Sequence, residues 1–145
     1  MPSTIRPASV DDLPRVRVLL AQLGYDLEET ELGRRYRAVV NAPDHALLVA
    51  AQNGAVLGLM HLYVRPALDK PPEVVVQALV VEQTARGTGL GGRLMQSAER
   101  WAASHGFASV ALTSHIARSD ALAFYQRLGY RIEATSHLMR KTLAS

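Results

Sequence analysis

The feature that most constrains the fold is a buried-strand pattern that runs into a glycine-rich turn and then a helix pattern. Residues Val74–Val81 read VVVQALVV, a β-branched run typical of a central strand covered on both faces. The turn RGTGLGG follows at Arg86–Gly92, and apolar residues then recur at helical spacing. Glycines let consecutive backbone N–H groups converge, and the helix dipole adds positive charge there. The turn therefore predicts a phosphate cradle, with Arg86 and Arg93 as flanking charged donors.

The rest of the chain alternates between strand and helix patterns. Asn53-Gly54 between two apolar runs is a strong hairpin signal. We expect strands at residues 4–8, 46–52, 55–64, 74–81, 109–113, 130–134 and 136–143, and helices at 9–24, 28–41, 90–105 and 119–128. Together these elements predict a mixed α/β sheet with helices on its faces.

Composition narrows the class of protein. A chain of 145 residues with 48% hydrophobic residues is expected to form a single domain, residues 1–145, with a packed core. The net charge of +3 comes from basic residues scattered among acidic ones, so no nucleic-acid partner is expected. The absence of cysteine excludes thiol nucleophiles and Cys-ligated metals, and no metal is expected. No segment has the pattern of a membrane span or a signal peptide, so a cytoplasmic protein without a membrane partner is expected.

The glycine turn does not fit the two commonest phosphate-binding motifs. A P-loop needs a lysine after its last glycine, and the spacing differs from that of the Rossmann fingerprint. A glycine turn that binds nothing is the alternative. A helix start with several glycines is costly, up to about 1 kcal/mol for each relative to alanine, which favours a functional use.

Two motifs resemble the GNAT superfamily of N-acetyltransferases. RGTGLG at Arg86–Gly91 resembles its R-x-x-G-x-G loop, and ALAFYQRLGY at Ala121–Tyr130 resembles its A-x-x-[FL]-Y-x-x-x-G-[FY] signature. The resemblance implies a GNAT-like α/β fold, with a mixed central sheet of about six to seven strands flanked by about four helices. It also implies an enzyme that transfers the acetyl group of acetyl-CoA directly to a primary amine.

The resemblance assigns roles to individual residues. The coenzyme pyrophosphate would be held by Arg86, Gly87, Thr88, Gly89, Leu90, Gly91 and Gly92. The main chain of Leu79, Val80 and Val81 would pair with the pantetheine arm as an added strand would. Tyr125 matches the tyrosine that protonates the departing thiolate. Taken without the resemblance, Tyr125 is better explained as a core aromatic residue.

One catalytic position departs from the family pattern. Many members carry a glutamate as general base where this chain has Gln77, and an amide cannot accept a proton. The replacements left open are a water chain, His61 or His115, since imidazole titrates near neutral pH, or an amine that needs no strong base. Period-two alternation places Gln77 on the face of Val75, Leu79 and Val81, and we interpret it as a residue of the substrate cleft.

A second departure concerns the acceptor. Many relatives, including those that act on protein N-termini, have asparagine where this chain has Arg118. TSHIARSDALAFY and LLAQLGY are instead similar to the aminoglycoside and aminoalkylphosphonate acetyltransferases of the superfamily. That similarity implies a small-molecule amine as substrate and names Tyr25, Ser114 and His115 as acceptor-site residues.

Other functions stay open at this point. A protein N-terminal or lysine acetyltransferase is one alternative. A non-catalytic acyl-CoA sensor is another, and Gln77 supports it. The resemblance also admits a homodimer, because the family often pairs subunits through its late strands.

Overall fold

The computed structural model describes residues 3–114, 116 and 118–144. The chain forms two compact units, Met1–Thr113 and Ser114–Ser145, and each is described by itself. The first unit holds the sheet and three helices, and the second holds one helix and an extended segment. The expectation of a single domain stays a prediction.

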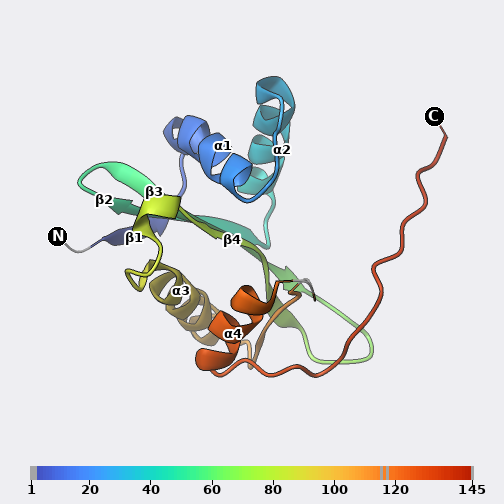
Figure 1. Ribbon diagram of the computed structural model, residues 1–145. Coiled ribbons are helices and arrows are strands. Elements are labelled where there is room, and N and C mark those ends of the chain that lie inside the picture. Colours follow the sequence, from blue (N-terminus) through green and yellow to red (C-terminus); the bar gives the residue numbers. More distant parts are fainter. Residues whose placement is uncertain (1–2, 115, 117, 145) are drawn as a thin grey trace. The chain divides into compact units, whose positions relative to one another are not determined.

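Five strands in sequential order make one mixed sheet (Figure 1). The first four pair antiparallel and the last pair is parallel. The strands are β1 (Thr4–Pro7), β2 (His45–Gln52), β3 (Ala55–Arg65), β4 (Glu73–Val81) and β5 (Val110–Leu112). The β2–β3 hairpin turns at Asn53-Gly54 as predicted, with both residues at positive φ.

Three of the helices begin and end within one residue of the predicted positions, whereas the first α-helix begins at Leu13, four residues after its predicted start, because a 3₁₀ turn at Val10–Asp12 precedes it. The helices are α1 (Leu13–Gln22), α2 (Glu29–Asn41), α3 (Leu90–Ser104) and α4 (Ser119–Arg127), with short 3₁₀ turns at Val10–Asp12 and Gln83–Ala85. Glu28 caps α2, because its carboxylate accepts from the N–H groups of Thr30 at 2.9 Å and Glu31 at 3.0 Å. None of the helices in the described part of the chain has the length and apolar content that a membrane crossing requires.

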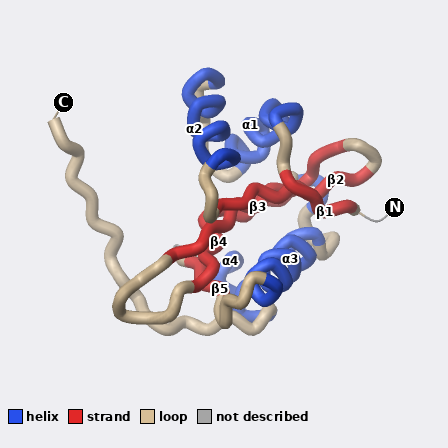
Figure 2. The backbone as a smooth tube through the Cα atoms, turned by 180° about the vertical axis from the view of Figure 1, so that it is seen from behind, coloured by secondary structure: helices blue, strands red, loops and turns tan. Residues whose placement is uncertain are grey.

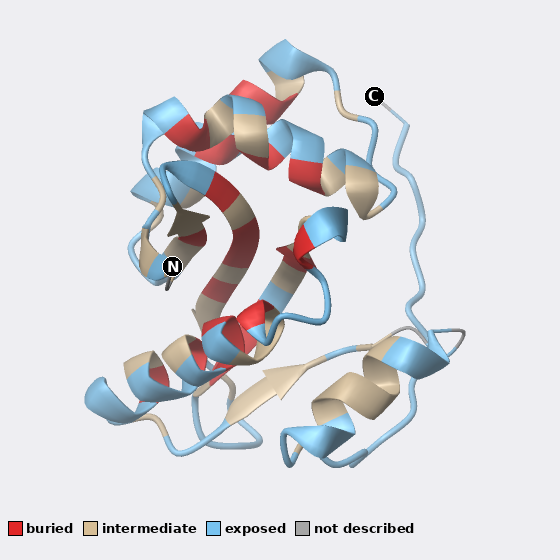
Figure 3. Ribbon diagram, turned by 60° about the vertical axis from the view of Figure 1, so that its left-hand side comes forward, coloured by how far each residue is buried: buried red, intermediate tan, exposed pale blue. Residues whose placement is uncertain are grey.

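The two faces of the sheet are covered by different helices of the first unit. Helices α1 and α2 pack on the face that carries Val49, Leu59 and Val80. Helix α3 packs on the opposite face, where Gly58 allows a close approach: a Cβ there would come within 2.9 Å of Leu94. The buried residues therefore lie along both sides of β3 and β4 and on the inner sides of these helices (Figure 3).

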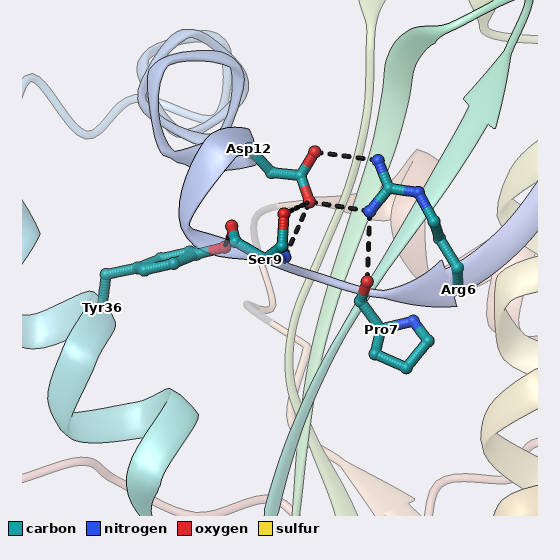
Figure 4. Close-up of polar contacts among 5 residues, drawn as sticks. All are labelled: Arg6, Pro7, Ser9, Asp12 and Tyr36. Carbon is teal, nitrogen blue, oxygen red and sulfur yellow. Dashed lines mark hydrogen bonds and ion pairs between the residues drawn. The ribbon is translucent and has the colours of Figure 1, made fainter.

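A polar network fastens the first helical turn to the sheet edge (Figure 4). The Arg6 guanidinium donates to both carboxylate oxygens of Asp12, at 2.8 and 2.9 Å. Asp12 also accepts from the Ser9 N–H at 2.8 Å, as expected of a helix N-terminus with Ser9 as its cap. The Tyr36 hydroxyl of α2 donates to the Ser9 carbonyl at 2.5 Å. The network fixes α1 and α2 to one end of the sheet.

The class of the predicted fold is confirmed, but the predicted number of strands is wrong. The sheet has five strands, not six to seven. The described residues of 130–134 and 136–143 form no strand, and Figure 2 shows the chain after α4 as loop. Their alternating residues carry a strand pattern, but a strand exists only when a partner supplies hydrogen bonds, and pattern alone does not supply one.

Candidate acyl-donor site on β4 and the glycine loop

Strand β4 has one edge that is only partly paired. On one side it pairs with β3 from end to end except at Gln77, whereas on the other side β5 pairs only with Val74–Val76. From Gln77 to Val81, no other strand of the described residues pairs with this second edge. The backbone groups there can accept an extended ligand in the manner of an added strand. Leu79, Val80 and Val81, predicted for this role, lie on this edge.

Gln77 is the extra residue of a β-bulge. His61 pairs with Ala78 and Leu62 pairs with Val76, so Gln77 has no partner residue on β3, and its side chain is exposed. The bulge shifts the alternation by one residue. Val75, opposite Tyr63, therefore shares the α1/α2 face with Val80, and the predicted common face for Val75, Leu79 and Val81 is wrong. The bulge lies where the β4 edge loses its β5 partner.

The glycine loop leads from the end of β4 into α3. Gly87 and Gly89 have φ of +81° and +85°, a backbone conformation that favours glycine. The first backbone hydrogen bond of α3 runs from the Arg93 N–H to the Gly89 carbonyl at 3.1 Å. The N–H groups of Leu90, Gly91 and Gly92 thus lie in the first helical turn, where no preceding carbonyl of the helix accepts them. Such donors suit an anion.

The two arginines that flank the loop have different contacts. Arg86 is exposed, and its Nε–H donates to the Val81 carbonyl at 3.2 Å, which holds the guanidinium beside the open β4 edge. Arg93 instead donates to the Ser3 carbonyl at 2.9 Å and contacts the Ser3 hydroxyl. Thr88 donates to the Ala85 carbonyl at 2.6 Å, which stabilises the loop from within. Arg86 is therefore the better placed of the two for an anion at the loop.

A side-chain bridge connects the loop to α1. The Gln22 amide donates to Glu82 at 3.0 Å and accepts from the Gln83 N–H at 3.0 Å. Glu82 also accepts from the Thr84 N–H at 2.5 Å, and contacts with Thr84 and then Gln22 hold the pKa of Glu82 below its ordinary value. Sequence reasoning missed this bridge, since its ends are 60 residues apart and no motif marks them.

The hairpin brings two histidines together. His45 Nδ1 lies 2.9 Å from His61 Nε2, and the His45 ring stacks on Tyr63 with centroids 5.2 Å apart. Burial, and then the charge of His45, lowers the pKa of His61 to about 4. Sequence reasoning named His61 as one open alternative for the base but missed its partner His45.

The other predicted residues are spread over the chain. Tyr25 is exposed in the α1–α2 connection. In the second unit, Ser114 is half-buried, Arg118 is exposed at the N-cap of α4, and Tyr125 lies on α4. The ring of Tyr125 contacts Phe124 and Tyr130, and burial raises the pKa of its hydroxyl. His115 lies outside the described residues.

Comparison with known proteins places the chain among acyltransferases. The sequence profile of the acetyltransferase (GNAT) family matches residues 13–130. The chain is 30% identical over 129 residues to aminoalkylphosphonate N-acetyltransferase of Salmonella typhimurium, a match that covers 88% of this chain and 84% of that protein. It is 39% identical over 72 residues to mouse N-alpha-acetyltransferase 80, covering 50% of this chain but 22% of that protein.

Solved structures agree on the fold. Aminoglycoside N-acetyltransferase AAC(6')-Iy, in complex with CoA, superposes with a TM-score of 0.88 at 20% identity. The match covers 97% of this chain and 95% of that one.

Proposed function

The chain belongs to the acetyltransferase (GNAT) family, and we propose on this basis that it acetylates a primary amine of a small molecule with acetyl-CoA as donor. The observation that carries the proposal is the open edge of β4, which leads into a loop of anion-binding backbone donors. An extended arm with a polyanionic end suits that arrangement. The CoA complex of the similar aminoglycoside acetyltransferase supports the choice of donor.

The residues present fit the pyrophosphate and the pantetheine arm of acetyl-CoA. The loop N–H groups and Arg86 would hold the pyrophosphate. The main chain of Leu79, Val80 and Val81 would pair with the amide groups of the pantetheine arm. Gln77 lies four residue steps before Val81, about 13 Å along the strand. The acetyl end of the arm would therefore lie toward the bulge at Gln77.

Transfer requires three events at the acetyl group. The amine nitrogen attacks the carbonyl carbon, the carbon–sulfur bond breaks, and protons move from the amine and to the thiolate. We assign Tyr125 as the group that protonates the thiolate, on the strength of its place in the ALAFYQRLGY motif. Gln77 can orient the amine or a water by hydrogen bonding but cannot accept its proton.

The acceptor class rests on the relatives that match most of the chain. One is named for aminoalkylphosphonates, and a similar structure is named for aminoglycosides. Both substrate classes are small amines. We propose Tyr25, Ser114 and His115 as acceptor-site residues, because of the motifs that contain them.

A second candidate is acetylation of a protein N-terminus. The match to mouse N-alpha-acetyltransferase 80, the highest identity among the relatives described above, favours it. Arg118, in the position where many such enzymes have asparagine, weighs against it.

A thiol-release assay separates these functions. Purified protein with acetyl-CoA is offered aminoalkylphosphonates, aminoglycosides and N-terminally free peptides, and products are weighed by mass spectrometry. We expect CoA release and a single acetyl group on a small amine. Turnover on peptides alone would select the second candidate, and acetyl-CoA binding without CoA release on any amine would indicate an acyl-CoA sensor.

We also propose that the protein pairs with a second copy of itself through residues 131–144. This segment is extended and belongs to no strand of the sheet, and it exposes Ile132, Leu138, Met139 and Leu143. An extended apolar segment is stabilised when it adds to another sheet. Sedimentation should show a dimer, and Leu138→Asp should shift it toward the monomer, whereas Leu68→Asp, in another exposed loop, should not. A wild-type monomer at all concentrations would refute the pairing.

A further inference from the structure

The His45–His61 pair lies on the same face of the sheet as the cluster packed against α1 and α2. His61 is opposite Leu47 in the β2–β3 register, and His45 is opposite Tyr63. Side chains two residues apart share a face, and Leu59 and Val49 of this face belong to the core beneath α1 and α2. The two imidazoles therefore continue that face along the hairpin.

The pair also lies level with the bulge of β4. His61 is the residue paired with Ala78, the neighbour of Gln77. Adjacent strands are about 4.8 Å apart. A thioester on the open edge of β4 would lie two strand spacings, about 10 Å, from the backbone of His61, so an amine that approaches it over the α1/α2 face would pass between the two.

The hydrogen bond between the rings restricts how protons are placed. His45 Nδ1 and His61 Nε2 are 2.9 Å apart, so one of them carries the shared hydrogen and the other accepts it. When His61 Nε2 carries the hydrogen, its Nδ1 holds a lone pair. His45 is exposed, so a proton taken up by His61 can pass across the shared bond and leave through His45.

We propose that His61 accepts the proton of the attacking amine and that His45 is the positioning residue that fixes its tautomer and passes the proton to solvent. The inference rests on the proposed acetyl transfer. The amine nitrogen forms the new bond to the acetyl carbon, the carbon–sulfur bond breaks, and the amine proton moves to His61 Nδ1. The thiolate takes a separate proton, from Tyr125 in the proposed function.

The groups around the pair keep His61 neutral, so its lone pair is available for a proton, although a lowered pKa also makes it a weaker base than a free imidazole. Half-buried His61 is neutral near pH 7, because burial and the neighbouring His45 lower its pKa. Tyr63 on β3 stacks on His45, and Asp44 precedes His45 in the chain. Arg65 and Glu73, further along β3 and β4, pair with each other. Val40 of α2 lines the same cavity as His45, and Ala78 of β4 is the register partner of His61.

The test compares His61→Gln, His45→Gln and His105→Gln with the wild type. His105 is an exposed histidine on the C-cap of α3, and its substitution is the matched control. Steady-state kcat and KM are measured with acetyl-CoA and an amine that the wild type acetylates, at about pH 7 and about pH 9.5, the latter close to the pKa of a typical primary amine. Thermal unfolding checks that each variant is folded.

At neutral pH we expect His61→Gln to lose about 100-fold in kcat, as for removal of a general base. His45→Gln should lose about tenfold, and His105→Gln nothing. At alkaline pH, where a large fraction of the amine is free base before it binds, the His61→Gln deficit should shrink to about threefold. A merely structural role would give the same deficit at both pH values.

The outcomes separate two failures. Full activity of His61→Gln, or a deficit that does not change with pH, would overturn the histidine pair and leave the acetyl transfer standing. Absence of turnover in the wild type on every amine would overturn the proposed function, and the pair's role with it. If His61→Gln does not fold, His45→Gln alone decides, because His45 is exposed.

Discussion

Asp12 is a charged side chain that connects β1, the first helical turn and, through Ser9, helix α2. It is buried, and its bidentate pair with Arg6 holds its pKa at about 2, well below the ordinary value. A carboxylate with a lowered pKa stabilises the fold while it is charged. Its contribution is present above the unfolded-state pKa and is lost as the pH falls toward the folded-state pKa.

Asp12→Asn should lower the free energy of unfolding at neutral pH by about 1 to 2 kcal/mol, after allowance for the partly exposed Arg6. The variant should also lose less stability than the wild type between pH 3.8 and about 2, the two pKa values of Asp12. Urea unfolding across this range measures both effects. Asp11→Asn, at the exposed neighbouring position, is the control and should behave as the wild type does. Equal stability of both variants would contradict the role of the ion pair.

The acid role proposed for Tyr125 is also tested by a single substitution. Tyr125→Phe removes the hydroxyl but keeps the ring contacts with Phe124 and Tyr130. We expect kcat to fall about 100-fold with little change in acetyl-CoA affinity. Tyr130→Phe, on a neighbouring ring, should keep most of the activity. Unchanged turnover in Tyr125→Phe would reject the assignment.

At the scale of elements, the site depends on how α1 is joined to the loop after β4. The Gln22 amide contacts Glu82 and the Gln83 N–H, so the end of α1 supports the segment that leads into the glycine loop. We expect Gln22→Leu to weaken acetyl-CoA binding about three- to tenfold, as loss of one or two hydrogen bonds would. Gln96→Leu, an exposed change on α3, is the control. Equal acetyl-CoA affinities of Gln22→Leu and the wild type in a calorimetric titration would show that α1 does not support the loop.

The elements show what the sequence could predict and why the rest was hidden. Strand and helix positions follow from local periodicity, and the glycine loop was recognisable because its motif is contiguous. The histidine pair could not be recognised from local sequence. A two-residue turn at Asn53-Gly54 sets a register in which His45 would lie opposite Leu62, on the other face from His61. The register shift at Leu57 moves His45 opposite Tyr63 and onto the face of His61.

The bulge at Gln77 was hidden for the same reason. Alternation in VVVQALVV is continuous in the sequence, and only pairing with β3 shows that one residue is extra. For the two predicted C-terminal strands the error is the reverse: the sequence predicts strands that the structure does not form. Their residues alternate suitably, but pairing depends on a partner that local sequence does not specify. Bulges and pairings are properties of two segments, so one segment alone does not reveal them.

At the scale of the whole molecule, the residues proposed for acetyl transfer are distributed over both units. The open β4 edge, the bulge and the glycine loop all belong to the first unit, whereas Tyr125 belongs to the second. Family membership covers both, since the matched residues run from 13 to 130. The central claim is that the β4 edge and its loop bind acetyl-CoA.

Calorimetric titration of acetyl-CoA into the wild type, Gly89→Ala and Gly106→Ala tests that claim most directly. Both glycines have positive φ and open space around a Cβ, but Gly89 begins α3 at the loop and Gly106 lies past its other end. The account predicts saturable one-site binding by the wild type and Gly106→Ala. It predicts affinity about tenfold weaker, or about 1.4 kcal/mol, in Gly89→Ala, because alanine disfavours the backbone conformation that directs the loop N–H groups. No saturable binding by the wild type, or equal loss in both variants, would contradict it.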